Sequence, residues 1–235
     1  MSAYLALDTS GPTARIALVD AGGTCLASGE RTSLRHSATL LPLLHELLGR
    51  AGLVVPNLRG IACGAGPGSF TGLRVGLAVA KGLALAFDLP LVLVPSLTAL
   101  AVDLAAGGAT GLIAPCIDAG KGEVYVQLFR AGSADPVPLG PELRTTAEIF
   151  AAELAGNQQT ARFAGTGADR QRAAITAVLG ETAVVPDFPG PSALAIARLA
   201  LPRLLRGEHD DLDSAVPAYG RPPDITTPKP KPPPN

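Results

Sequence analysis

The stretch Tyr4-Leu5-Ala6-Leu7-Asp8 decides the fold, because it is an apolar run that ends in an acid and is followed by a turn. Gly11-Pro12 marks that turn, and Arg15-Ile16-Ala17-Leu18-Val19 is a second apolar run. Gly22-Gly23 predicts another turn, after which Cys25 to Glu30 completes a third run. Because short turns join neighbouring antiparallel strands, the first thirty residues predict an antiparallel meander.

Helices and strands alternate after the meander. Leucines crowd a wide apolar surface between Ser37 and Arg50, which is typical of a helix packed on a core. The apolar run from Gly60 to Gly64 predicts a strand, and a glycine-rich turn and a long helix to about Phe87 follow it. With a last strand from Leu91 to Val94, the first half predicts a β-β-β-α-β-α-β unit.

The second half of the chain repeats this pattern in outline. Leu112 to Asp118 is again an apolar strand that ends in Asp, Gly120 and Gly122 predict a turn, and Glu123 to Phe129 alternates as a strand does. The stretch from Arg162 to Gly167 repeats the strand and glycine turn, and a helical pattern follows it. Two such halves predict an α/β fold with two lobes of actin-like or ribonuclease-H-like (ASKHA) topology, in which helices flank mixed sheets.

The expected division of the chain follows from these halves. Residues 1–105 form the N-terminal lobe, which we expect to carry dimer contacts, and residues 106–216 form the C-terminal lobe, whose last helix runs from Ser192 to Arg206. Residues 217–235 are polar and rich in proline, and such a segment buries too little apolar area to offset the entropy lost on ordering. We expect a disordered tail there, with a proline-rich docking motif as the alternative.

The composition limits what the chain binds. Apolar residues make up 47% of the 235 positions, and the formal net charge is -1. A protein that holds tRNA by itself usually has a basic excess, so we expect any contact with nucleic acid to be shared with a partner. The three cysteines have no CxxC spacing, which is typical of core thiols in a reducing cytosol. Neither a secretory signal nor a membrane-spanning run is evident.

The glycine-rich stretch Gly64 to Gly72 and the acids at the strand ends raise the hypothesis of a nucleotide site. The stretch lacks the ending of a Walker A loop, but backbone amides at the start of a helix can bind anions. Asp8 and Asp118 could hold ATP or ADP with magnesium between the lobes. The alternative is that the glycines allow tight packing and each Asp caps a turn. The candidate residues are Asp8, Thr9, Ser10, Gly66, Gly68 and Asp118.

Small residues recur every four positions on the helix after the glycine-rich turn. Gly72, Gly76 and Ala80 share one side of that helix, and so little bulk allows another helix to approach closely. One interpretation is that this side docks a second subunit together with the leucine-rich helix, and the alternative is burial inside its own lobe. The predicted interface residues are Leu40, Leu41, Leu44, Leu48, Gly72, Leu73, Gly76 and Ala80.

The sequence contains no recognisable catalytic set. His36, His45 and His209 form no spacing that is typical of a transition-metal site. Ser69 lies in Gly68-Ser69-Phe70 and not in the GxSxG pattern of a nucleophile elbow. The chain is therefore predicted to supply no nucleophile, base or metal site of its own.

Several of these stretches together resemble the TsaB family, the dimerisation subunit of the bacterial machinery that makes threonylcarbamoyladenosine in tRNA. The most specific is Gly66-Pro67-Gly68-Ser69-Phe70-Thr71-Gly72-Leu73-Arg74-Val75-Gly76. The others are Leu5 to Ser10, His36-Ser37 with Leu40-Leu41-Pro42, Ala80 to Ala84, and Asp118-Ala119 with Glu123-Val124-Tyr125. The resemblance is close over residues 4–130. It departs at Gly120, where the family usually has Arg, and at Pro217 to Arg221, where the family usually has Pro-x-Tyr-Leu-Arg.

The resemblance implies a subunit without a catalytic metal. The catalytic paralogue, TsaD, binds a metal through two His four residues apart, and the matching positions here are Ser96 and Leu100. The implied role is to pair with TsaD and help recruit the ATPase subunit TsaE for threonylcarbamoyl transfer to the adenosine next to the anticodon of ANN-decoding tRNAs. A homodimer in isolation, contact with tRNA only through the complex, and a cytoplasmic location are also implied. The competing hypothesis is an actin-like ATPase or a peptidase.

Overall fold

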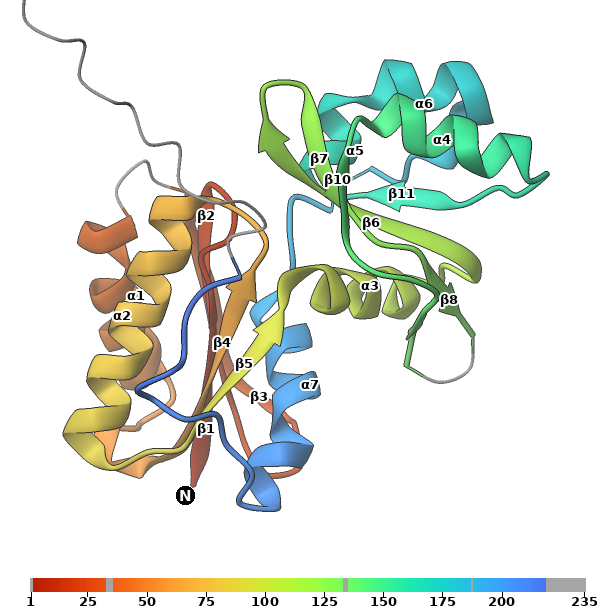
Figure 1. The fold of residues 1–235 in the computed structure, drawn as a ribbon. Helices are drawn as coiled ribbons and strands as arrows, with labels where there is room; N and C mark the ends of the chain where they lie inside the picture. The colour runs from red at the N-terminus through yellow and green to blue at the C-terminus, as the bar shows by residue number, and fades with distance from the viewer. Residues whose placement is uncertain (1, 33–35, 133–134, 187, 219–235) are drawn as a thin grey trace, which may run out of the picture.

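The computed structural model describes residues 2–32, 36–132, 135–186 and 188–218, which form two lobes (Figure 1). The sheet of the first lobe has the order β3-β2-β1-β4-β5. Strands β1, β2 and β3 are antiparallel as the turns predicted, and β4 and β5 run parallel to β1. The strands are β1 (Ala3–Asp8), β2 (Thr13–Val19), β3 (Cys25–Thr32), β4 (Leu58–Gly66) and β5 (Leu91–Pro95).

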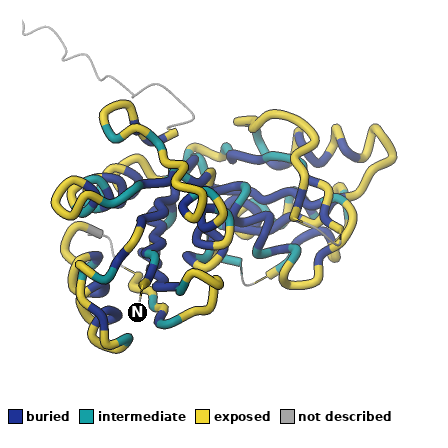
Figure 2. Tube along the Cα trace, turned by 90° about the horizontal axis from the view of Figure 1, so that it is seen from below, coloured by how far each residue is buried: buried dark blue, intermediate teal, exposed yellow. Residues whose placement is uncertain are grey.

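Helices cover both faces of this sheet (Figure 1). Leu5 and Leu7 point to the face covered by α1 (His36–Arg50) and α2 (Phe70–Phe87), while Ala6 points to the other face. That other face carries α3 (Ser96–Ala106) and α7 (Ala193–Leu205). Both faces are buried, so the strands and the inner sides of the helices form the interior of the lobe (Figure 2). A short 3₁₀ turn, η1 (Val55–Asn57), leads into β4.

The second lobe repeats the start of the first in a smaller form. Strand β6 pairs with β7 antiparallel and with β11 parallel, as β1 does with β2 and β4. The strand expected from Glu123 to Phe129 is divided, because β7 pairs with the end of β6 and β8 pairs with its beginning. The elements are β6 (Gly111–Gly120), β7 (Glu123–Val126), β8 (Phe129–Ala131), β9 (Val137–Pro138), β10 (Leu143–Thr145), α4 (Ala147–Gly156), β11 (Arg162–Ala164), α5 (Thr166–Arg170), α6 (Arg172–Leu179) and η2 (Glu181–Ala183).

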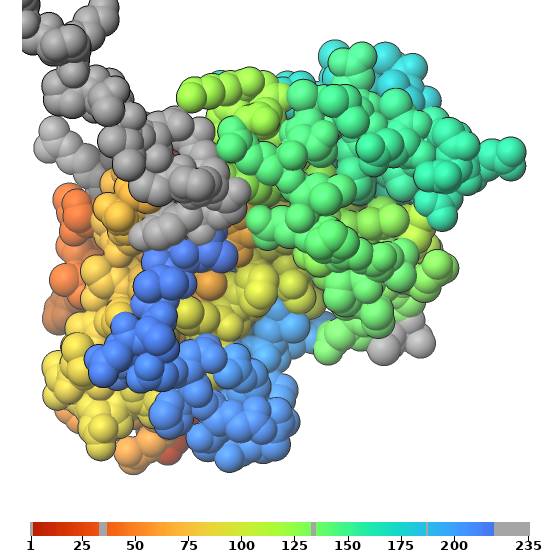
Figure 3. All heavy atoms as spheres, in the orientation of Figure 1, coloured from red at the N-terminus to blue at the C-terminus, as the bar shows by residue number. Residues whose placement is uncertain are grey.

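The C-terminal part of the described chain belongs to the first lobe, and this differs from the expected division at residue 105. Helix α7 packs on the first sheet because its buried side is apolar. Residues 208–218, here called the strap, then cross the same lobe (Figure 3). The Asp210 amide donates to the Leu91 carbonyl at 2.8 Å, and the Ala218 amide donates to the Ala65 carbonyl at 2.7 Å. The prediction of a disordered tail from residue 217 is wrong for its first two residues, because Pro217 is buried and Ala218 bonds to Ala65. The rest of the predicted tail, residues 219–235, lies outside the described residues.

Helix α2 is the one described helix whose length and mean hydropathy, 1.4, would allow it to cross a membrane. Six of its residues are buried, and its inner side packs on the first sheet. Packing in the core of the first lobe therefore explains the apolar composition of α2.

Two of the three cysteines lie in the core, as their apolar neighbours predicted. Cys63 and Cys116 are buried, and burial raises the pKa of both thiols above the usual range. Cys25 differs, because it starts the outermost strand β3 and is exposed.

Candidate functional site

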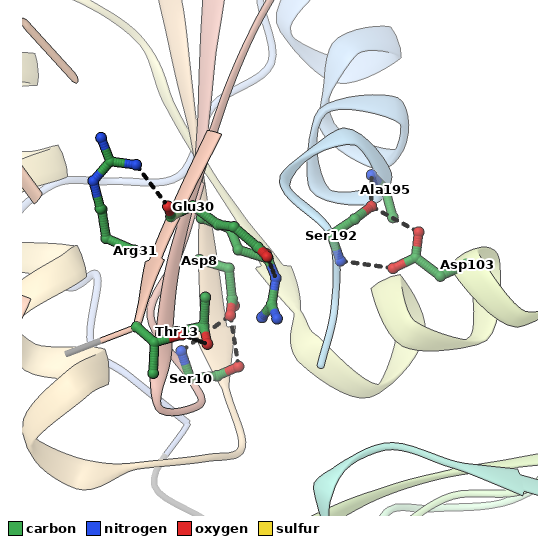
Figure 4. A network of polar contacts seen from close by, with 10 residues as sticks. Asp8, Ser10, Thr13, Glu30, Arg31, Asp103, Ser192 and Ala195 are labelled. Atoms are coloured by element: carbon green, nitrogen blue, oxygen red, sulfur yellow. Dashed lines mark hydrogen bonds and ion pairs between the residues drawn. The ribbon is translucent and has the colours of Figure 1, made fainter. Parts of the chain in front are cut away.

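Asp8 ends β1 in a buried polar cluster (Figure 4). Its Oδ1 accepts hydrogen bonds from the Ser10 amide at 3.1 Å and the Ser10 hydroxyl at 2.8 Å, and its Oδ2 accepts one from the Ser96 hydroxyl at 3.5 Å. Burial raises the pKa of the Asp8 carboxyl, and the bonds from Ser10, the charge of Arg15 and the bond from Ser96 offset part of that rise. A magnesium ion at Asp8 would have to displace these donors.

Arg15 is a buried cation beside this cluster that the sequence patterns did not single out. It lies opposite Asp8 in the β1–β2 register, and its Nε donates to Glu30 Oε2 at 3.0 Å. Burial also raises the pKa of Asp103 on α3, and the hydrogen bonds from Ser192 and the charge of Arg15 offset part of that rise. The positive charge of Arg15 therefore offsets the negative charges of Asp8 on β1, Glu30 on β3 and Asp103 on α3.

The raised pKa of Asp8 leads to a prediction about stability. Folded Asp8 holds its proton more tightly than unfolded Asp8, whose usual pKa is 3.8. Its favourable contribution is therefore present below that pKa and is lost as the pH rises through the folded pKa. Asp8→Asn keeps an oxygen for the bonds from Ser10 and carries no charge. The variant should lose less stability than the unmodified chain between about pH 4 and pH 7, measured as free energies of unfolding in urea.

Asp211→Asn is the matched control, with the opposite sign. Hydrogen bonds from Ser214 and Asp213 lower the pKa of Asp211, so its contribution is present above the usual pKa of 3.8 and is lost as the pH falls. Asp211→Asn should therefore reduce the gain in stability that accompanies rising pH. Equal pH profiles for Asp8→Asn and the unmodified chain would contradict the assignment of a buried, proton-retaining Asp8.

The glycine-rich loop between β4 and α2 closes over the turn that follows Asp8. The Ser69 amide donates to the Ser10 carbonyl at 2.7 Å, and the Gly66 amide donates to the Ser96 hydroxyl at 3.2 Å. These amides are among those that the nucleotide hypothesis assigned to a phosphate. In the structure they bind the protein's own oxygens.

Two glycines of the glycine-rich stretch, Gly64 in β4 and Gly68 in the loop, have no room for a side chain. A Cβ at Gly64 would overlap Asp8 Oδ2, and a Cβ at Gly68 would overlap the Ser10 carbonyl. Of the two interpretations of the glycines, close packing therefore accounts for both positions. The structure brings Asp8, Thr9 and Ser10 together with Gly66 and Gly68, but as a buried junction and not as an open cleft.

The small-residue side of α2 packs against the same turn. Thr9 Oγ1 donates to the Gly72 carbonyl at 2.8 Å. A Cβ at Gly72 would overlap the Thr9 carbonyl, and a Cβ at Gly76 would overlap Thr9 Oγ1. Leu73 and Ala80 are buried as well. The alternative of burial inside the lobe is thus what the structure shows for this side, and a second subunit cannot reach it.

The leucines of α1 that were predicted to form an interface face the sheet in the same way. Leu40, Leu44 and Leu48 are at most 5% exposed, because they lie on the side that packs on β2 and β3. Leu41 points away and is 51% exposed. Of all the predicted interface residues, only Leu41 is therefore available to a partner in this structure.

The outer sides of α1 and α2 lie next to each other and expose a different set of residues (Figure 1). Small residues recur every four positions here too, at Ala78, Gly82 and Ala86, and a Cβ at Gly82 would meet nothing within 4 Å. Large apolar side chains accompany them, and the Arg74 guanidinium lies 4.0 Å from the centre of the Phe70 ring. We call this the α1–α2 surface, and its exposed residues are Leu41, Phe70, Ala78, Gly82, Leu85 and Ala86.

Asp118 occupies the corresponding turn of the second lobe. Its carboxylate pairs with Arg170 and accepts a hydrogen bond from the Gly120 amide at 3.2 Å, and its own amide donates to Thr166 Oγ1 at 3.1 Å. These partners lie in the second lobe, whereas those of Asp8 lie in the first. Within the described residues, no group of three or more His, Cys, Asp or Glu side chains could hold a metal ion.

Ser96 and Leu100 are the residues that the family resemblance aligns with the metal ligands of the catalytic paralogue. Both are fully buried. Ser96 bonds to Asp8 and Gly66, and Leu100 packs between Leu97 and the second-lobe strands β6 and β7. Neither side chain is an imidazole, and both have structural contacts that fill the position.

Comparison with known proteins gives a consistent set of relatives. The family model of the tRNA N6-adenosine threonylcarbamoyltransferase TsaD matches residues 28–211. The tRNA threonylcarbamoyladenosine biosynthesis protein TsaB of Bacillus subtilis is 30% identical over 195 residues, which cover 81% of this chain and 84% of that protein. TsaB of Escherichia coli is 38% identical over 122 residues, 52% of each chain. The chain thus spans about half the length of the Escherichia coli and Haemophilus influenzae relatives.

Solved structures confirm the fold. YeaZ from Pseudomonas aeruginosa superposes with a TM-score of 0.77 at 30% identity, covering 93% of this chain and 100% of that one. A crystal structure described by its similarity to peptidase YeaZ from Pseudomonas aeruginosa gives 0.80 at 31% identity, covering 94% and 100%. The activator of 2-hydroxyisocaproyl-CoA dehydratase from Clostridium difficile gives 0.53 at 12% identity, covering 87% and 96%, and shares the fold alone. The predicted two-lobed, actin-like α/β architecture is therefore confirmed.

Proposed function

This chain belongs to the TsaB family of tRNA threonylcarbamoyladenosine biosynthesis proteins, and on that premise we propose that it is the non-catalytic partner subunit of a threonylcarbamoyltransferase. The chain pairs with its catalytic paralogue TsaD and keeps that enzyme active for transfer to the adenosine next to the anticodon of ANN-decoding tRNAs. It helps recruit the ATPase subunit TsaE, contacts tRNA only through the complex, and works in the cytoplasm, where tRNA is modified.

The observation that carries this proposal is the α1–α2 surface. It combines large exposed side chains, Leu85 at 69% and Leu41 at 51%, with a stripe of small residues that allows a partner helix to come close. Exposed apolar patches of this kind mark interaction sites, and a specific interface here should bury more than about 1,000 Å². The same surface would form a homodimer in the isolated chain and exchange it for the heterodimer with TsaD.

The buried junction around Asp8 supports a non-catalytic role. Ser96 and Leu100 contribute a hydroxyl and an alkyl group where the catalytic paralogue places two imidazoles, and an alkyl group cannot bind a metal. Asp8 is closed off by the glycine-rich loop, so a substrate has no access to its carboxylate.

Reconstituted threonylcarbamoyl transfer to tRNA tests the proposal. We expect transfer by TsaD and the other pathway components only when this chain is added, and none by the chain alone. Transfer is measured as threonylcarbamoyladenosine in digested tRNA. Unchanged transfer with and without the folded chain would overturn the proposal, and so would transfer by this chain in the absence of TsaD.

A further inference from the structure

A pocket of about 510 Å³ lies between the β2–β3 turn and α7, on the side of the first sheet opposite the α1–α2 surface. Its volume falls in the range of small-molecule sites. Most of its lining is apolar, and it is formed by Ala21, Gly22, Gly23, Cys25, Leu194, Ala197, Arg198, Leu201, Pro202 and Leu205. We call it the α7 pocket, and none of the contacts described for the Asp8 junction involves it.

The wall that the β2–β3 turn contributes is preformed. Asp20 Oδ1 accepts hydrogen bonds from the Gly22 amide at 2.9 Å and the Thr24 amide at 2.8 Å. Gly23 has a φ of +82°, which favours glycine, and a Cβ there would lie 3.7 Å from Leu201. The turn is thus held against α7 without a ligand, which lowers the entropy cost of binding.

The wall that α7 contributes combines leucines with one cation. Leu194 and Leu205 are 41% and 52% exposed, so apolar surface stays open at this helix. Among the described residues of the lining, Arg198 is the only charged one, and it pairs with Asp135 of the second lobe at 2.6 Å. Both side chains of this pair are more than half exposed, and such pairs contribute little, so another anion can take the place of Asp135.

We propose that the α7 pocket binds a small molecule with an apolar body and an anionic head group, such as a medium-chain carboxylate. The body lies against the leucines of α7 and the β2–β3 turn, and the head group accepts hydrogen bonds from the Arg198 guanidinium. The sign of the head group follows from Arg198, the one charged side chain among the described lining residues, whose exposed pair with Asp135 can be exchanged for a ligand's anion. This ligand site is independent of the proposed pairing with TsaD.

Cys25 provides the readout, because it lines the pocket and is exposed while Cys63 and Cys116 are buried. Iodoacetamide should therefore alkylate Cys25 first in the folded chain. Decanoate, used as the probe, should protect Cys25 in a saturable way, and the rate of alkylation against decanoate concentration gives its Kd. Decanol is the uncharged probe of the same length.

Two variants should move the affinity in opposite directions. Arg198→Gln should weaken decanoate binding about threefold and leave decanol binding unchanged, and Asp135→Asn should strengthen decanoate binding by removing a competing carboxylate. Both side chains are exposed, so the fold should tolerate both changes. Arg31→Gln, at an exposed Arg that pairs with Glu46 elsewhere, is the control and should change nothing.

Three results would overturn the proposal. The first is the absence of saturable protection of Cys25 up to millimolar decanoate. The second is equal protection by decanoate and decanol in the unmodified chain. The third is a decanoate affinity that does not respond to Arg198→Gln or Asp135→Asn. A change in transfer to tRNA is not part of the readout, so failure here leaves the proposed pairing function untouched.

Discussion

Gly82→Arg is expected to abolish pairing with TsaD in a chain that still folds, whereas Gly76→Arg is expected to prevent folding. Gly82 lies in the open on the α1–α2 surface, so an arginine there extends into solvent in the free chain and meets the partner only on pairing. An unpaired charge forced into an interface costs at least about 3 kcal/mol, or more than a hundredfold in Kd. At Gly76 even a Cβ overlaps Thr9 Oγ1 inside the lobe.

Two measurements separate these outcomes. Thermal unfolding followed by circular dichroism should give Gly82→Arg a midpoint close to that of the unmodified chain and Gly76→Arg no cooperative transition. Analytical ultracentrifugation with TsaD then measures pairing by the folded variant. The alanine pair is the matched control: Gly82→Ala should fold and pair, while Gly76→Ala should already be destabilised. Pairing of Gly82→Arg with unchanged affinity would show that the α1–α2 surface is not the interface.

This contrast also shows what the sequence of α2 could not decide. Two sets of small residues recur there at the same spacing, Gly72 with Gly76 and Ala80, and Ala78 with Gly82 and Ala86. Because the helix is apolar on nearly all sides, periodicity alone does not indicate which set faces the sheet. The choice is made by Thr9, whose carbonyl and hydroxyl occupy the space beside Gly72 and Gly76. That contact joins residues 63 positions apart, so no local pattern contains it.

The elements of the first lobe could be predicted because each depends on local signals. Apolar runs and short turns predicted β1 to β3, and the glycines around residue 66 marked the passage from β4 to α2. The place of α7 could not be predicted in this way, since its pattern indicates a helix with an apolar side but not which sheet receives it. The strands of the sheet on which α7 packs come about a hundred residues or more earlier in the sequence. The expected boundary at residue 105 therefore did not account for the return of the chain to the first lobe.

In the candidate site, too, the residues could be picked out from the sequence, but how deeply they are buried could not. Of the residues grouped by the nucleotide hypothesis, Asp8, Thr9, Ser10, Gly66 and Gly68 lie together while Asp118 does not, because a strand end and a glycine turn of neighbouring parallel strands meet at one edge of the first sheet. Their burial was not predictable, since it depends on Ser96, 88 residues from Asp8, and on the missing side chain of Gly64. The local sequence is therefore compatible both with an open phosphate-binding loop and with a closed junction.

Deleting residues 208–235 is expected to destabilise the first lobe strongly, although it removes no predicted helix or strand. The strap lies along β5, the last strand in the order of the first sheet, and it buries Ala215 and part of Leu212 against the lobe. The deletion removes, among others, the four hydrogen bonds that join the strap to β4, β5 and α2, those of Asp210 with Leu91 and Leu93, of Lys81 with Ala215, and of Ala218 with Ala65. At about 1 kcal/mol each the loss is about 4 kcal/mol, which lowers the unfolding midpoint by about 10 °C in a chain of this size.

Two matched changes locate the source of that loss. Deleting only residues 219–235 should leave the midpoint unchanged, because the sequence of this segment predicts little apolar burial. Within the strap, Asp210→Ala removes the acceptor of the Leu93 amide and of Arg203 and should lower the midpoint, while Asp213→Ala changes an exposed residue and should not. If both deletions unfold at the same temperature, the strap contributes nothing to the lobe. If the longer deletion alone is unstable, the first lobe is built from both ends of the chain, and an isolated piece that ends at residue 105 cannot serve as a stable pairing domain.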